Sequence, residues 1–89
     1  MTVYVLHRYW NTPDNEGNEI VGVYSREASA YNDMKLDVEK VKSYYSLGFW
    51  EDDATWENTR EIHLGRIRGT EIERYATIYG WEIKELEVQ

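Results

Sequence analysis

Two histidines, His7 and His63, are the only side chains of this 89-residue chain that ordinarily titrate near neutral pH. Nucleophilic catalysis would need one of them beside a hydroxyl and a third group that orients the ring. Both fall in segments expected to be strands, and they would approach each other if those strands pair. A histidine in a small sheet is more often a hydrogen-bonded structural residue, and a chain this short leaves little room for a cleft between catalytic carboxylates. The sequence therefore predicts a protein without enzymatic activity.

Acidic residues after position 50 have the composition of a hard-cation site without its spacing. They are Glu51, Asp52, Asp53 and Glu57. The calcium-loop pattern D-x-[DN]-x-[DN]-G-x5-E is absent, and consecutive acids point in different directions unless a loop gathers them. The lack of cysteine excludes thiolate zinc sites, and neither G-x-G-x-x-G nor G-x-x-x-x-G-K-[ST] occurs. We therefore expect no resident metal or cofactor.

Arginines form one local cationic region in this acidic chain. They are Arg60, Arg66, Arg68 and Arg74. Arginine binds phosphate through two parallel hydrogen bonds and stacks on bases, so one interpretation is a subsite for a nucleotide-like anion, placed at a homo-oligomer interface. The alternative, which we favour, is that these arginines pair with neighbouring carboxylates of the same chain.

The stretch YYSLGFWEDDATWEN, residues 44–58, holds five aromatic side chains and four carboxylates. Tyr45 continues the apolar stripe of a predicted helix, and Phe49 is expected to return to the core, but no periodicity explains the two tryptophans. Interfaces are enriched in Trp and Tyr, and nearby acids would pair with a basic partner. One hypothesis is therefore a partner-binding surface; the other is a lid on the core beside a solvated turn. The surface hypothesis comprises Trp50, Glu51, Asp52, Asp53, Trp56 and Glu57, with Trp10 as a second candidate.

The net charge of −7, from 10 Lys and Arg against 17 Asp and Glu, bears on the kind of partner. A negative field repels nucleic-acid phosphates, so direct nucleic-acid binding is not expected. The same field steers the protein toward basic surfaces, although a charge of magnitude ~2–8 also serves solubility alone. The lack of cysteine favours the cytoplasm, and we expect neither a signal peptide nor a membrane span.

The elements that would position these residues begin with a hairpin. Residues 3–10, VYVLHRYW, are rich in β-branched and aromatic residues and predict a strand. Residues 11–19 are dense in Asn, Asp and Gly and contain the single proline, which is turn chemistry. Residues 20–24, IVGVY, predict the second strand.

A helix of roughly twenty residues is expected next, with Ser25 as its N-cap and Gly48 as its stop. Apolar residues recur at spacings of three and four along one face. They are Ala28, Tyr31, Met34, Val38, Val41 and Tyr45.

The last third of the chain predicts strand, helix and strand. Residues 60–67, REIHLGRI, alternate until Gly65, where a bulge is expected. Thr70 and Glu73 form a capping-box pattern for a short helix through residue 79, and Gly80 would end it. Residues 81–88, WEIKELEV, predict the final strand.

The predicted order is therefore β-β-α-β-α-β in a single α+β domain, residues 1–89. Its architecture would be a mostly antiparallel four-stranded sheet with two helices packed on one face.

The leading functional hypothesis is a non-enzymatic, small acidic protein that docks on a basic macromolecular surface. By analogy of size and charge, it would be a phage or mobile-element inhibitor that occupies the nucleic-acid site of a host defence enzyme. The alternatives are a nucleotide-like anion binder acting as a homo-oligomer and a structural or assembly subunit that uses exposed strand edges.

Overall fold

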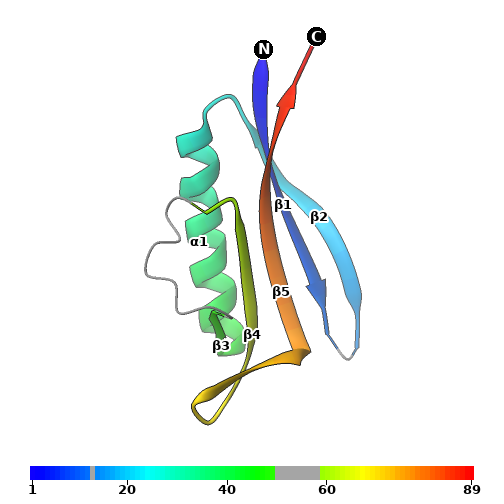
Figure 1. The fold of residues 1–89 in the computed structure, drawn as a ribbon, viewed down its shortest axis with the longest axis vertical. Coiled ribbons are helices and arrows are strands. Elements are labelled where there is room, and N and C mark those ends of the chain that lie inside the picture. The colour runs from blue at the N-terminus through cyan, green and yellow to red at the C-terminus, as the bar shows by residue number, and fades with distance from the viewer. Residues whose placement is uncertain (13, 50–58) are drawn as a thin grey trace.

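Over the residues that the structure describes, the fold is one antiparallel sheet with a single helix on one face (Figure 1). The computed structural model describes residues 1–12, 14–49 and 59–89, the side chains of 74–77 excepted. The described strands lie in the order β2-β1-β5-β4-β3. The elements are β1 (Thr2–Asn11), β2 (Glu16–Tyr24), α1 (Glu27–Tyr45), β3 (Leu47–Phe49), β4 (Glu61–Arg68) and β5 (Glu71–Glu87).

The predicted hairpin of the first two strands is confirmed, with β1 and β2 antiparallel. At the turn, Thr12 N–H donates to the Asn15 carbonyl at 2.7 Å. Strand β2 starts at Glu16, earlier than the turn-rich composition suggested. Gly17 lies within this strand. The position has no room for a side chain because the Trp10 ring lies over it, and a Cβ there would come within 2.6 Å of that ring.

The first predicted helix is confirmed, but its ends differ. The N-cap is Arg26, without a side-chain cap bond, and Ser25 lies outside the helix. At the other end Ser46 adopts the left-handed conformation (φ 54°) and its N–H donates to the Lys42 carbonyl, so the helix stops before Gly48. The buried face consists of Ala30, Met34, Val38 and Val41.

Two aromatic residues after the middle of the helix behave differently from each other. Tyr45, expected in the core, is 50% exposed. Phe49 lies in β3 and packs against the core, as the sequence predicted.

The second predicted helix is wrong, because residues 71–87 form one long strand, β5. Gly69 has φ 65°, and with Thr70 it makes a two-residue connection between the paired residues Arg68 and Glu71. A positive φ at the first of two turn residues is typical of a type II′ hairpin, so Thr70 is a turn residue and not a cap. The architecture is therefore mostly β with one helix, not two helices on a four-stranded sheet.

Two sets of pairs hold this segment extended: residues 71–73 pair with β4 across the turn, and residues 78–80 pair with both β4 and β1. Strand β5 is the central strand, hydrogen-bonded to β1 on one edge and to β4 on the other. Tyr79, Trp81 and Ile83 share one face with period two, across the glycine that looked like a helix stop. The register shifts between Gly65 and Arg66, the position where the sequence predicted a bulge, but the residues passed over are on β5, since Gly65 pairs with Ile78 and Arg66 with Glu73.

The core lies between α1 and the face of the sheet that it covers. From the strands, the fully or nearly buried side chains are Leu6, Leu47, Ile62, Leu64, Trp81 and Ile83. Figure 1 shows α1 running along this side of the strands, while the tip of the β4–β5 hairpin extends beyond the end of the helix.

The other face of the sheet, which we call the open face, has no covering layer among the described residues. Cross-strand pairs place its side chains in rows. They are Val5, His7 and Tyr9 on β1, Ile20 and Val23 on β2, Glu61 and His63 on β4, and Glu82, Lys84 and Leu86 on β5.

Candidate functional site

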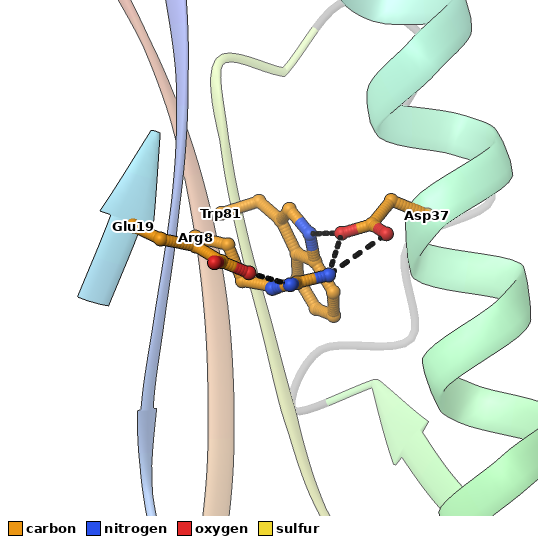
Figure 2. A network of polar contacts seen from close by, with 4 residues as sticks. All are labelled: Arg8, Glu19, Asp37 and Trp81. Carbon is orange, nitrogen blue, oxygen red and sulfur yellow. Dashed lines mark hydrogen bonds and ion pairs between the residues drawn. The ribbon is translucent and has the colours of Figure 1, made fainter. Parts of the chain in front are cut away.

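A network of polar contacts fastens the helix to the covered face (Figure 2). Arg8 Nη1 donates to both carboxylate oxygens of Asp37, at 2.9 and 2.8 Å. The indole N–H of the buried Trp81 donates to Asp37 Oδ2 at 2.7 Å. Glu19 on β2 also pairs with Arg8. Three elements are thus joined through one guanidinium, whose orientation is fixed.

Beside this network lies a cleft of about 320 Å³ between the last turns of α1 and the covered faces of β1 and β5. We call it the aromatic cleft. It is lined by Arg8, Trp10, Lys40, Val41, Tyr44, Tyr45 and Tyr79. The strand residues reach it because Trp10 and Tyr79 are direct cross-strand partners, and the helix residues because four positions separate Lys40 from Tyr44.

Aromatic rings form a continuous wall on one side of the cleft. Tyr79 stacks on Tyr45 with centroids 5.4 Å apart and on Trp10 with centroids 6.5 Å apart. Tyr44 meets Tyr45 edge to face at 4.7 Å. Burial, followed by the hydrogen bond with Tyr45, raises the pKa of Tyr79, so its phenol is neutral at physiological pH.

The two cations that line the cleft differ in how they are balanced. Arg8 is bound by Asp37 and Glu19, and its side chain is 23% exposed. Lys40 is exposed and makes no ion pair with a described residue. The uncompensated charge of the cleft therefore comes from Lys40.

The histidines lie on the open face and are linked through a tyrosine. The Tyr9 hydroxyl and His63 Nε2 share a hydrogen bond of 2.7 Å, and the Tyr9 ring lies between the two imidazoles, with centroids 6.4 Å from His7 and 6.1 Å from His63. The strands of the two histidines do not pair directly, since β5 separates β1 from β4. His7 Nε2 instead contacts Asn18 Oδ1 at 3.3 Å.

Glu61, His63 and Tyr9 superficially resemble an acid, a base and a hydroxyl nucleophile. Glu61 Oε1 lies 3.1 Å from His63 Nε2, the same nitrogen that contacts Tyr9. A catalytic relay uses one ring nitrogen for the nucleophile and the other for the orienting acid. Burial, reinforced by the charges of Glu61 and Glu82, also raises the pKa of Tyr9, which opposes formation of a phenolate. This cluster therefore fits a structural hydrogen bond better than catalysis.

Most residues of the predicted partner surface are not among those that the structure describes. Trp50, Glu51, Asp52, Asp53, Trp56 and Glu57 lie outside the described residues. Trp10, the second candidate, is in the aromatic cleft. Within the parts of the chain that are described, no group of three or more His, Asp or Glu side chains is arranged to hold a metal ion.

Two of the four arginines of the predicted subsite, Arg60 and Arg68, have defined contacts, and they lie at opposite ends of β4. Arg60 precedes β4 and pairs with Glu27 at 2.9 Å. Arg68 ends that strand, roughly 26 Å away at ~3.3 Å per residue, and lies 3.6 Å from Glu73. A hydrogen bond with Tyr31 and the charge of Glu27 raise the pKa of Arg60 further.

Arg66 is exposed, and the side chain of Arg74 is outside the description. The two arginines whose contacts are defined follow the alternative of pairing within the chain.

Sequence reasoning missed most of the cleft. Lys40 and Tyr44 carry a usable signal, because their spacing of four places a cation beside an aromatic ring on one helix face. Tyr79 was assigned to a helix, and Arg8 carried no signal of its own. These residues meet only because β5 lies beside β1.

Comparison with known proteins provides no external guide to this site. No family model matches the chain, and no curated protein or solved structure is significantly similar to it. No helix of the described residues is long and apolar enough to cross a bilayer.

Proposed function

We propose that this is a non-enzymatic binding protein that docks through its open face on a basic surface of another protein. The observation that carries the proposal is the combination, on one uncovered sheet face, of exposed apolar side chains with carboxylates. The face is built from four adjacent strands and is therefore broad.

The apolar part of the face lies toward the end where β2 leads into α1. Ile20 is 63% exposed, Val23 59% and Leu86 48%. Val23 lies directly opposite Val5, which widens the apolar row. Apolar residues gathered on one exposed face are typical of an interaction surface.

The acidic part of the face adjoins this row. Glu61 and Glu82 are direct cross-strand partners, a like-charge arrangement that costs stability on its own. His63 at 3.1 Å from Glu61 and Lys84 at 3.9 Å from Glu82 compensate only in part. A basic partner would relieve the remaining repulsion, and the net charge of −7 would steer it toward the protein.

The same charges argue against a second copy as the occupant. A two-fold dimer through the open face would bring the carboxylates of two chains with a charge of −7 each toward one another. The specific case that we retain is an inhibitor from a phage or mobile element, acting in the cytoplasm by covering the nucleic-acid site of a host defence enzyme. Its support is the analogy of size and charge together with the absence of cysteine.

Capture from a lysate of the native host, at low and at high salt, tests the proposal. The expected result is a basic protein that is captured at low salt and lost at high salt. Leu86→Ser and Glu82→Gln should weaken capture, and Glu82→Gln should slow association by up to about tenfold. The matched controls, Leu36→Ser and Glu39→Gln, change exposed residues of α1 and should bind like the wild type.

Two results would contradict the proposal. One is that the amount of partner captured does not change with salt or with the open-face substitutions. The other is a dimer in sedimentation that Leu86→Ser dissociates, because the open face would then bind a second copy.

A further inference from the structure

We propose that the aromatic cleft is a binding site for a small planar aromatic ligand that carries an anionic group, a carboxylate or a phosphate. The ring would lie against the aromatic wall, and the anion would pair with Lys40. The site is on the helix-covered side of the sheet, and its occupant is a small molecule, so the inference is independent of docking through the open face.

The wall offers a surface for a ring but no slot between its own rings. The pairs of the wall have centroids 4.7–6.5 Å apart, which leaves no room for another ring between them. A ligand ring must therefore stack on the outer surface of the wall, where the cleft of about 320 Å³ is. That volume lies at the lower end of the ~300–1,000 Å³ found for small-molecule pockets.

Packing among the described residues does not account for the exposed aromatic residues at the end of α1. Tyr44 is 79% and Tyr45 50% exposed, although both are large rings that usually cover a core. Exposed tyrosines that converge with a tryptophan on one cavity are typical of a stacking platform, since aromatic rings bind planar ligands of many kinds.

The charge of the cleft selects an anion over a cation. A cationic ligand could also lie on aromatic faces, but Lys40 at the rim would repel it. Arg8 is held by two carboxylates, Asp37 and Glu19, neither of which lines the cleft, so Lys40 is the lining cation that has no ion pair with a described residue. Lys40 is also more than one turn from the end of the helix at Tyr45, so the negative end of the helix dipole does not cancel its charge.

Titration of the ¹⁵N-labelled protein, followed by NMR, tests the inference with defined probes. Adenosine monophosphate and indole-3-carboxylate supply a ring with a phosphate and with a carboxylate; adenosine, indole and inorganic phosphate supply one half each. Ring-plus-anion probes should shift the Trp10 indole N–H and the amides around Lys40 and Tyr79, with affinity about tenfold above that of the neutral rings. Binding of only one of the two anionic probes would identify the preferred anion.

Substitutions separate the two halves of the site. Lys40→Gln should remove the advantage of the anionic probes and leave the binding of neutral rings unchanged. Tyr44→Ala should weaken all ring probes. Both side chains are exposed, so folding should persist, and Lys84→Gln on the open face is the matched control for charge.

Three outcomes would overturn the inference. Neutral rings could bind as tightly as the anionic ones, shifts could map to the open face, or no shift could appear at millimolar probe. None of these bears on capture of a basic partner, so this inference and the proposed function can fail separately.

Discussion

The two faces of the sheet are built from the same strands, yet their side chains differ in burial and in polar contacts. Leu6 and Trp81 point toward α1 and are fully buried, whereas the neighbouring positions His7 and Glu82 point the other way. On the covered face polar groups are bound into the Arg8–Asp37–Trp81 network; on the open face they meet in pairs near solvent. One residue step along a strand thus separates a side chain that packs in the core from one that faces away from the helix.

The difference between the two faces indicates where binding residues are expected in so small a protein. The side chains of the covered face are needed for the core, because a chain of this length buries little other apolar surface. Only its outer end, where the helix finishes, leaves room for a cleft. The side chains of the open face are not needed to form this core. The composition of the open face is therefore the better guide to a macromolecular partner.

The largest expected difference between the two faces is in the stability cost of replacing a leucine by alanine. Leu6→Ala should lower the free energy of unfolding by ~2–5 kcal/mol, because the side chain is 0% exposed and leaves a cavity. Leu86→Ala, with the side chain 48% exposed, should cost less than about 1 kcal/mol. Urea unfolding measures both. Equal losses would mean that the open face is covered in solution.

A second pair contrasts a part-buried carboxylate with an exposed one. Asp37→Asn removes the charge that holds Arg8 and should cost ~2–4 kcal/mol, because the guanidinium stays partly buried. Glu27→Gln, which breaks the exposed pair with Arg60, should cost under ~1 kcal/mol. Chemical denaturation distinguishes them, and a similar small cost for both would show that the network does not fasten the helix.

A glycine on the open face is sensitive for a different reason. The Tyr9 ring lies directly over Gly80, so Gly80→Ala would displace that ring and its hydrogen bond to His63, at a cost of ~1–2 kcal/mol. Combined with Tyr9→Ala, the same change should cost little, since the obstructing ring is gone. A double-mutant cycle measures the difference. Additive costs would indicate that backbone freedom, not the ring, requires glycine.

The smallest expected effect is a pH dependence at the edge of the covered face. Burial, then the 2.6 Å hydrogen bond to Asp33, raises the pKa of Tyr24 to about 12. The folded value lies above the unfolded value of 10.0, so this stabilisation is complete below pH 10 and declines as the pH rises toward 12. The melting-temperature difference between wild type and Tyr24→Phe should shrink over that interval, and a constant difference would contradict the assignment.

Local patterns predicted the elements whose signals are local. Spacing of three and four residues marked α1, and turn composition marked the β1–β2 hairpin. They failed at residues 70–80, where Thr70 and Glu73 imitate a helix start. Residues 71–73 are extended because they pair with β4 across the turn, and residues 78–80 because they also pair with β1. The contacts with β1 join residues ~70 positions apart, which leave no mark in a short window.

The candidate site was less predictable than the fold. Trp10 was singled out as an unexplained aromatic residue, and the structure places it in the cleft. Its partners come from α1 and β5, so their convergence depends on a strand order that the sequence does not encode in any local pattern. Composition alone predicts a basic partner, and docking of that partner on the open face is our proposal.

The central position of β5 has a consequence for the way the chain acquires its structure. The first strand finds its inner neighbour only when residues 78–87 are present, which makes this pairing the longest loop closure in the sheet. Sheets closed by such distant segments form slowly compared with helical domains. During synthesis β1 and α1 are made before β5, so their core side chains stay uncovered until β5 has left the ribosome.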